Sequence, residues 1–559
     1  MTPIALRPVS ETGTGPRHAA PTFLLIGPYD PKGGEYTFLA PPLGVWRLAG
    51  VLRRHGFAAT VFDPNCTDGA PEAALAELLR VDPWTVIGVS TTGMTLAHDL
   101  ALAHLARRLC PGACIVAGGM EATFNVERVL DLGPFDCVVL GEGEQPLIEL
   151  GQRLQSGSDL AGIAGTARRL EDGRIDRCPG PAMTGEQLRD AIFETPYEDM
   201  PYGTYWARLE QAYGVGGLPV KAEREARLAE IRSVRLITLN YCPMGCTFCS
   251  STNFLHAAQG GQTARIARLD EEGCLSMLKR IVRAHPRVRT VIFQDDIFAF
   301  TKDPRILALC QAILDAKAAG DLPAALQFIS TNRIDAMTVE RLHAMHAAGF
   351  RVLGFGIESF SPNVLREFNK AAIVPFISPM LEAALTLGIT PFLDMILTSP
   401  RCDLADLAEN IRGALRWIEA GCEVGVYPYV VPFSGAAMAS DPALVPQTVY
   451  TRHEVAGTAI AWDQPSKILP AAADVRDAIL TIERRVDHVL DRLETQCGHL
   501  PSRVRSLIWV TCAIPVLRER GMEMPDAGRA ERALMQQLPA RRYAKVRALL
   551  NPPMVRRAS

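Results

Sequence analysis

Three cysteines crowd into one short segment, and their spacing carries the clearest chemical signal in the sequence. In YCPMGCTFCSS, Cys242, Cys246 and Cys249 form a C-x3-C-x2-C pattern. Three thiolates on one loop suit three irons of a cubane [4Fe–4S] cluster and leave the fourth iron open. A closed zinc site needs a fourth Cys or His close by, and the next candidate, His256, follows Cys249 by seven residues. The pattern therefore favours an iron–sulfur cluster over zinc or a metal-free loop.

The composition is that of a folded protein with more than one domain. A chain of 559 residues exceeds one ordinary hydrophobic core and predicts two or three domains. The net charge of −3 gives no electrostatic reason to expect a nucleic-acid partner. No run of about 18 uncharged apolar residues occurs, so no membrane span is expected. Most of the fourteen cysteines stand alone in apolar segments, and no signal-peptide pattern is present, which predicts reduced thiols and a cytoplasmic location.

Strand and helix patterns alternate over residues 22–154 and predict a Rossmann-like α/β domain. Five short apolar runs are its candidate strands: TFLLIG, ATVFD, TVIGVS, CIVAGG and DCVVLG. Amphipathic segments between them predict helices on both faces of a parallel sheet. Ligands of such sheets bind beyond the carboxyl ends of the strands. We therefore expect the binding loops at residues 27–42, 64–69, 90–95, 118–125 and 141–144.

A second alternating series over residues 233–440 predicts a partial (β/α)6 barrel of the TIM type. Its candidate strands are RLITLNY, TVIFQDD, LQFISTN, VLGFGIES, TPFLDMILT and EVGVYPYVV. Repeated right-handed β/α crossovers build an open or closed barrel whose strand ends converge on one mouth. The remaining segments are expected to be a disordered leader (1–21), a connector with some helix (155–232) and a helical C-terminal region (441–559), with no strand after Asp441.

The cysteine segment resembles the signature of the radical S-adenosylmethionine (SAM) superfamily. The spacing matches, an aromatic residue (Phe248) precedes the last cysteine, and the motif follows the first barrel strand. The resemblance implies that the three cysteines hold a [4Fe–4S] cluster whose open iron is chelated by SAM. It also implies an external electron donor of the flavodoxin or ferredoxin type and cleavage of SAM to a 5′-deoxyadenosyl radical.

Further motifs of the second domain resemble SAM-binding segments of the same superfamily. They are QDDIF, STNRID, GFGIES and PFSGAAM, and each lies at the end of a predicted strand. Two simpler interpretations stay open, since Asp296 is also a suitable helix cap and Arg333 also a suitable partner for Asp335. The resemblance places these residues near SAM: Phe248, Asp295, Asp296, Arg333, Glu358, Ser359 and Pro432.

The first domain resembles the cobalamin-binding half of cobalamin-dependent radical SAM enzymes. The similar segments are PPLGVWRLAGVLRRHG, VFDPN, VIGVSTTG, AGGMEATFN and VVLGEGE. The Asp-x-His-x-x-Gly motif that supplies a histidine to cobalt is absent, so a bound cobalamin would lack a protein histidine ligand; a domain without cobalamin is the alternative. The resemblance places these residues at cobalamin: Pro42, Leu43, Gly44, Asn65, Cys66, Ser90, Thr91, Thr92, Gly118, Gly119, Glu121, Gly141, Glu142 and Gly143.

Together the two resemblances imply a cobalamin-dependent radical SAM methyltransferase. Such an enzyme moves a methyl group from SAM, via methylcobalamin, to a carbon of a small-molecule substrate of the natural-product or cofactor type. Tyr427 and Tyr429 on the last predicted strand are the candidates for a general base. The alternatives are a radical SAM enzyme that catalyses cyclisation, rearrangement or oxidation, and a non-catalytic iron–sulfur protein that transfers electrons or acts as a scaffold.

Overall fold

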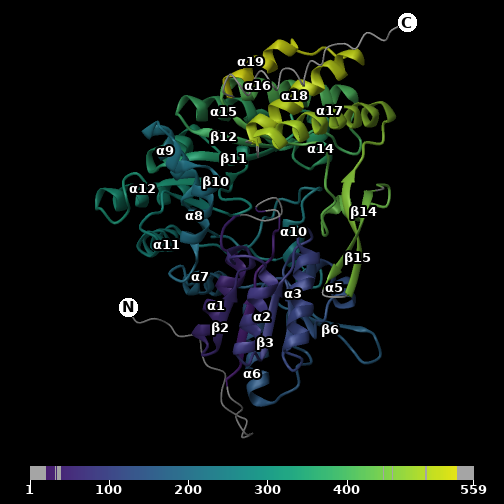
Figure 1. Cartoon of the computed structure of the whole chain (residues 1–559). Helices are drawn as coiled ribbons and strands as arrows, with labels where there is room; N and C mark the ends of the chain where they lie inside the picture. Colours follow the sequence, from purple (N-terminus) through teal and green to yellow (C-terminus); the bar gives the residue numbers. More distant parts are fainter. Residues whose placement is uncertain are drawn as a thin grey trace.

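The computed structural model describes residues 20–537, except residues 32, 34–38, 263, 445, 456–457, 498–499 and 501. Most of the expected leader and the basic C-terminal tail therefore lie outside the described residues. Figure 1 shows an N-terminal α/β domain in purple and blue, a second α/β layer in teal and green, and C-terminal helices in yellow. A long hairpin runs along one side of the molecule between the C-terminal helices and the N-terminal domain.

The N-terminal domain is built on a seven-stranded sheet in the order β2-β1-β3-β4-β5-β6-β7. Its first five strands pair in parallel and confirm the five expected strands. These strands are β1 (Thr22–Ile26), β2 (Ala58–Phe62), β3 (Val86–Ser90), β4 (Cys114–Gly118) and β5 (Cys137–Val139). The intervening helices are α1 (Leu43–Arg54), α2 (Pro71–Val81), α3 (Leu96–Leu109), α4 (Met120–Phe124), α5 (Val126–Leu132) and α6 (Glu144–Ser156).

Two further strands extend this sheet into the segment expected to be a connector. β6 (Thr166–Arg169) pairs antiparallel with β5, and β7 (Ile175–Cys178) pairs antiparallel with β6. The turn between them contains Asp172 and Gly173, and Gly173 has φ +83°. An Asp-Gly dipeptide is a typical hairpin turn, so a local signal for these two strands was present in the expected connector. The rest of the connector is helical: α7 (Gly185–Glu194), α8 (Tyr202–Ala212) and α9 (Lys221–Ile231).

The second domain is a six-stranded parallel sheet in sequence order, as expected for a partial barrel. Its strands are β8 (Ser233–Leu236), β9 (Thr290–Phe293), β10 (Gln327–Asn332), β11 (Phe350–Glu358), β12 (Thr390–Ile396) and β13 (Glu423–Tyr427). β13 and β8 do not pair within the described residues, so the barrel stays open. Its helices are α10 (Ser251–Ala258), α11 (Glu271–Ala284), α12 (Arg305–Ala318), α13 (Val339–Ala348), α14 (Pro362–Glu367), α15 (Ile377–Thr386) and α16 (Leu404–Ala420).

The C-terminal region begins with a hairpin, so the expectation that no strand follows Asp441 was wrong. β14 (Pro446–Val455) and β15 (Thr458–Ile468) pair antiparallel, and β14 contacts α3 of the N-terminal domain. The helices α17 (Ala473–Cys497), α18 (Ser502–Glu519) and α19 (Ala527–Gln537) follow. α18 packs against β13 and α16, so it covers the open edge of the barrel. Among the described helices, none has the length and apolar character needed to cross a membrane.

Candidate functional site

The three cysteines lie on the loop between β8 and α10, which the surrounding chain holds in shape. Thr252 Oγ1 donates to the carbonyl of Cys242 at 2.9 Å and accepts from the backbone N–H of Gly245 at 3.1 Å. Asn369 donates through Nδ2 to the carbonyl of Gly245, and Met438 donates its N–H to Thr247. All three thiols are free and partly buried. The loop therefore presents them together without a disulfide.

The donor set at this loop fits a cluster better than a single metal ion. Among the described residues, no three His, Cys, Asp or Glu side chains are placed to hold one ion. His256 is not brought in as a fourth ligand; its ring lies edge-on to Tyr241, with centroids 6.1 Å apart. A cubane cluster does not need the three sulfurs at one ion, because each binds its own iron. Burial raises the pKa of the Cys246 thiol, and the positive charges of Lys370 and Arg333 act in the opposite direction.

Glu358 is held in a strained backbone conformation beside the cysteine loop. Its φ is +64°, and the pairing of β11 with β12 shifts register between Gly356 and Glu358. Its carboxylate forms a buried ion pair with Lys370, with Nζ 2.9 Å from Oε1. A side chain at Gly356 would meet Glu358 Oε1 at 2.6 Å. A non-glycine residue at positive φ is costly and is often found at functional sites.

Three of the residues predicted at SAM are engaged by the barrel itself. Arg333 forms a two-point ion pair with Asp335 at 2.8 and 2.9 Å, which is the simpler interpretation left open above. The carboxylate of Asp295 accepts hydrogen bonds from the hydroxyl and N–H of Thr238 and from the N–H of Leu239. Ser359 donates to Asn410 Oδ1 at 2.8 Å in the core. These contacts brace the barrel mouth.

Of the other predicted SAM residues, Phe248 lies in the cysteine loop, and Asp296 lies close enough to act on Cys242 through its charge. Phe248 packs edge-on against Phe368, with ring centroids 4.9 Å apart, and Lys370 Nζ lies 5.8 Å from its ring centroid. Asp296 is exposed at the barrel mouth. The partial removal of its carboxylate from water raises its pKa, and a hydrogen bond with Ser251 lowers it. Pro432 is buried in the turn that follows β13.

The two tyrosines predicted as general bases have different environments. Tyr429 is buried, and its hydroxyl donates to Glu483 Oε2 of α17 at 2.8 Å. Tyr427 remains 54% exposed at the end of β13. Partial burial, and then the charges of Asp394 and Glu358, raise its pKa, so Tyr427 lies near these two carboxylates at the barrel mouth.

Asp394 is a site residue that the sequence analysis missed. It lies on β12 between Gly356 of β11 and Gly425 of β13, so neither neighbouring strand places a side chain beside it. Burial, and then the nearby charge of Glu358, raise its pKa to about 7. The sequence showed only an Asp in an otherwise apolar strand, and that was the available signal.

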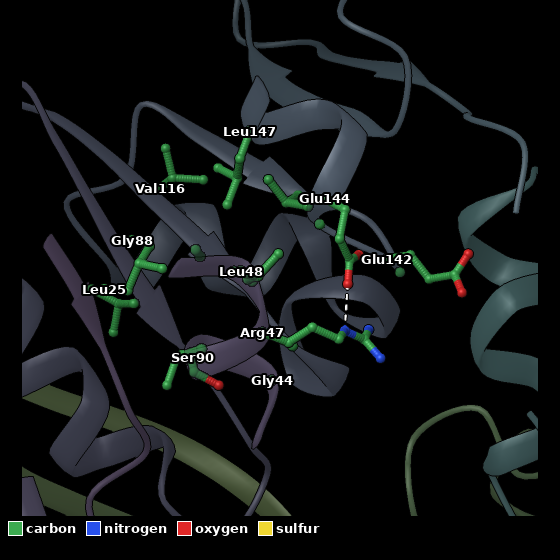
Figure 2. Close-up of a pocket in the computed structure, with 18 of the residues that line it drawn as sticks. Leu25, Gly44, Arg47, Leu48, Gly88, Ser90, Val116, Glu142, Glu144 and Leu147 are labelled. Carbon is green, nitrogen blue, oxygen red and sulfur yellow. Dashed lines mark ion pairs between the residues drawn. The ribbon is translucent and has the colours of Figure 1, made fainter. Parts of the chain in front are cut away.

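A cavity of about 280 Å³ opens at the carboxyl edge of the first sheet (Figure 2). Its apolar wall is formed by Leu25, Leu48, Val116, Val139 and Leu147. Glycines form much of the remaining wall: Gly44, Gly88, Gly118, Gly119, Gly141 and Gly143. The second domain closes it with Ile237, Leu239, Asn240 and Phe254. These four residues precede and follow the cysteine loop along the chain, so the cavity adjoins the segments that carry this loop.

Three charged side chains also line this cavity: Arg47, Glu142 and Glu144. Arg47 Nε lies 2.5 Å from Glu144 Oε1, and Glu144 is 2% exposed (Figure 2). Glu142 accepts from the N–H of Met183 at 2.6 Å, and burial together with the charge of Glu144 raises its pKa to about 7. The sequence analysis missed Arg47 and Glu144, although Arg47 lies one helical turn after Gly44 and Glu144 lies two residues after Glu142.

Half of the residues predicted at cobalamin line the cavity: Gly44, Ser90, Gly118, Gly119, Gly141, Glu142 and Gly143. The structure does not place the other half in its lining: Pro42, Leu43, Asn65, Cys66, Thr91, Thr92 and Glu121. Several of these shape the loops behind it. Asn65 joins two loops by bonding the N–H of Asp30 and the carbonyl of Pro28, and Thr91 donates to the carbonyl of Gly118.

The glycine-rich wall of the cavity leaves the backbone open to close approach by a ligand. A β-carbon at Gly44 or Gly118 would meet no protein atom within 4 Å, so these glycines leave open space. Gly119 has φ +100°, and a β-carbon there would lie 2.5 Å from the carbonyl oxygen of Thr91, so only glycine is compatible. The buried carboxylate of Glu144 has no hydrogen bond of good geometry within the described part of the chain. Arg47 balances its charge, but buried carboxylate oxygens without hydrogen bonds favour a ligand with complementary donors.

Fold and site together define a two-domain α/β protein in which a Rossmann-like ligand cavity faces a three-cysteine loop on a partial barrel. Residues 32–151 match the family described as B12 binding domain, and residues 236–412 match the Radical SAM superfamily. The chain therefore combines a B12-binding domain with a radical SAM domain, the organisation of cobalamin-dependent radical SAM enzymes.

Similar proteins share this organisation. The chain is 26% identical over 343 residues to the uncharacterized methyltransferase PH0819 of Pyrococcus horikoshii, covering 60% of this chain and 64% of that protein. The fold is similar to the cobalamin-dependent radical enzyme OxsB, with TM-score 0.63 at 14% identity over 95% of this chain and 79% of the other. It is also similar to the radical SAM methyltransferase TsrM of Kitasatospora setae, with TM-score 0.57 at 16% identity over 77% and 78% of the two chains. At these identities the two structural similarities concern the fold.

Proposed function

We propose that this protein is a cobalamin-dependent radical SAM methyltransferase that transfers a methyl group from SAM to a carbon of a small-molecule substrate. The observation that carries the proposal is that the segments on both sides of the cysteine loop line the cavity of the first domain. Asn240 and Phe254, which lie on either side of Cys242–Cys249, line the same cavity as Gly118 and Gly119. A methyl carrier and a cluster that act on one substrate must face a common space, and the position of these residues supports such an arrangement.

Each cofactor has a defined place in this proposal. Cys242, Cys246 and Cys249 hold the [4Fe–4S] cluster, and the glycine-lined cavity holds cobalamin. When bound, the cluster supplies the electron that cleaves SAM, and cobalamin supplies the methyl carrier. An external electron donor of the flavodoxin or ferredoxin type and a cytoplasmic location belong to the same proposal.

The residues of the barrel mouth bind and orient SAM and substrate. Glu358 is fixed by Lys370, which keeps its carboxylate in one position beside the cysteine loop. Asp394 has a pKa near neutrality, so it is suited to accept a proton or a hydrogen bond from the substrate. Tyr427 faces the same region, whereas Tyr429 is held by Glu483. The similarity to the methyltransferase PH0819 in sequence and to the methyltransferase TsrM in fold supports methyl transfer as the overall function.

The proposal is tested on anaerobically reconstituted full-length protein. After incubation with iron, sulfide and hydroxocobalamin and then desalting, we expect about four irons and one cobalt per chain. With methyl-labelled SAM and a reductant, a methyltransferase forms S-adenosylhomocysteine, and a radical mechanism also forms 5′-deoxyadenosine. Cleavage of SAM without S-adenosylhomocysteine or retained cobalt would instead indicate cyclisation, rearrangement or oxidation. A scaffold or electron-transfer protein would produce neither product.

A matched pair of cysteine variants serves as the control for the cluster. Cys246→Ala removes one of the three loop thiols and should abolish both the bound iron and SAM cleavage. Cys310→Ala removes a thiol buried in α12, away from the loop, and should keep both. Equal iron content in the two variants would contradict the assignment of the cluster to the loop.

A further inference from the structure

The carboxylate of Glu144 is built into the wall of the first-domain cavity with a cation beside it. Glu144 is 2% exposed, and within the described residues neither of its oxygens has a hydrogen bond of good geometry. Arg47 Nε lies 2.5 Å from Oε1, but Nε also lacks a well-directed acceptor. Figure 2 shows the two side chains pointing toward one another within the cavity. Both side chains therefore have unused hydrogen-bonding capacity facing the ligand space.

The chemistry of this pair is specific. A buried carboxylate only accepts hydrogen bonds, and a guanidinium only donates them. Side by side, they match a group that donates and accepts at adjacent atoms, and a primary amide has an NH2 donor and a carbonyl acceptor on one carbon. A ligand carboxylate offers no donor and would place a second negative charge against Glu144. Leaving a buried carboxylate oxygen without a hydrogen bond, or facing a like charge, is costly.

We propose that Arg47 and Glu144 form a recognition site for the primary amide of a propionamide side chain on the edge of the bound corrinoid, with Glu144 accepting from its NH2 and Arg47 donating to its carbonyl. Cobalamin carries primary amides around its ring, whereas other tetrapyrroles carry carboxylates at comparable positions. The pair therefore selects an amidated corrinoid and rejects a ring with a carboxylate at that position. This inference rests on the proposed binding of cobalamin and adds the residues that decide which tetrapyrrole is accepted.

Glu142 strengthens the selection against negative charge. It lines the same cavity two residues before Glu144, and its Oε2 is held by the N–H of Met183. A ligand carboxylate entering this end of the cavity would therefore meet two glutamates and only one arginine. A neutral amide does not add to this negative charge.

The test compares ligands that differ by one functional group. Full-length protein is titrated with hydroxocobalamin and with its three monocarboxylic acids, in each of which one propionamide is hydrolysed to a carboxylate. Binding is followed by equilibrium dialysis at pH 8, which requires no turnover. For the wild type, we expect at least one monocarboxylate to bind about tenfold or more weakly than cobalamin, as expected for an unpaired buried polar group.

Glu144→Gln should then change the preference as well as the affinity. The glutamine amide donates as well as accepts, so the same monocarboxylate should lose most of its tenfold disadvantage, while cobalamin binds more weakly. Glu149→Gln is the matched control, because Glu149 is on the same helix, pairs with Arg153 and does not line the cavity. It should keep the wild-type ratio.

The outcomes separate this inference from the proposed function. If the wild type binds cobalamin and all three monocarboxylates equally, or if Glu144→Gln keeps the wild-type ratio, the amide site is wrong and cobalamin binding stands. If hydroxocobalamin does not bind at all, the inference fails together with the cobalamin part of the proposed function. The wild-type comparison needs no variant, so misfolding of Glu144→Gln cannot rescue the idea.

Discussion

Lys370 Nζ lies 2.9 Å from Glu358 Oε1 and donates a second hydrogen bond to the carbonyl of Gly356 at 2.6 Å. This contact joins the end of β11 to the segment after α14 and keeps Glu358 at a positive φ. Because both side chains are buried, removing one partner leaves an uncompensated charge in the barrel wall.

Lys370→Met should therefore destabilise the protein by about 3 kcal/mol. Glu358→Gln should also be destabilising, because it leaves the ammonium group without its counter-charge. The double variant should recover part of the loss, since no isolated charge remains. Urea unfolding followed by circular dichroism, arranged as a double-mutant cycle, measures the coupling. Additive effects of the two substitutions would contradict a direct interaction.

Two neighbouring glycines of the first domain should respond differently to alanine. Gly119→Ala forces a β-carbon onto the carbonyl of Thr91 at a φ of +100° and should cost about 1–3 kcal/mol of stability. Gly118→Ala meets no protein atom within 4 Å, so stability should be unchanged or slightly higher. Its methyl group enters the cavity, however, and should weaken cobalamin binding. Thermal unfolding and equilibrium dialysis separate the two effects; a stable Gly119→Ala protein would refute the steric argument.

Asp394 should make the stability of the cofactor-free protein depend on pH. Its pKa in the folded state is about 7, above the value near 4 of an unfolded Asp. Between pH 4 and pH 7 the unfolded chain binds fewer protons than the folded protein, so the free energy of unfolding falls as the pH rises. The contribution of Asp394 to stability is therefore complete below about pH 4 and is lost as the pH rises through 7. Asp394→Asn lacks this dependence. From pH 5 to pH 8, we expect the wild type to lose roughly 2 kcal/mol relative to the variant in urea unfolding. If the unfolding free energies of the wild type and Asp394→Asn changed in parallel with pH, a raised pKa for Asp394 would be excluded.

One pair of conservative variants should distinguish a structural role of Tyr429 from a role of Tyr427 in methyl transfer. Tyr429→Phe removes the hydrogen bond to Glu483 and should lower stability by about 1–2 kcal/mol. Tyr427→Phe removes an accessible hydroxyl near Asp394 and should leave stability unchanged while it lowers methyl transfer. Melting temperature and S-adenosylhomocysteine formation are the two measurements. Unchanged turnover in Tyr427→Phe would remove it from the site.

Local patterns were sufficient for most of the secondary structure. All five strands expected in the first domain and all six expected in the second were found, because short apolar runs between amphipathic helices are a local signal. The hairpin β14–β15 lies after Asp441, where only helices were expected. β6 and β7 were missed because the Asp172–Gly173 turn was not used as a hairpin signal.

The sequence by itself determined the domain order, the cysteine loop and the glycine-rich ends of the first sheet, since each depends on neighbours along the chain. Only the tertiary structure decided which polar groups meet. Tyr429 and Glu483 are 54 residues apart, and Lys370 reaches Glu358 across a bulge in β11. Arg47 and Glu144 come from helices on different β/α units and meet only because the parallel sheet brings their ends to one edge. Side-chain pairing of this kind follows from three-dimensional packing, which local spacing does not encode.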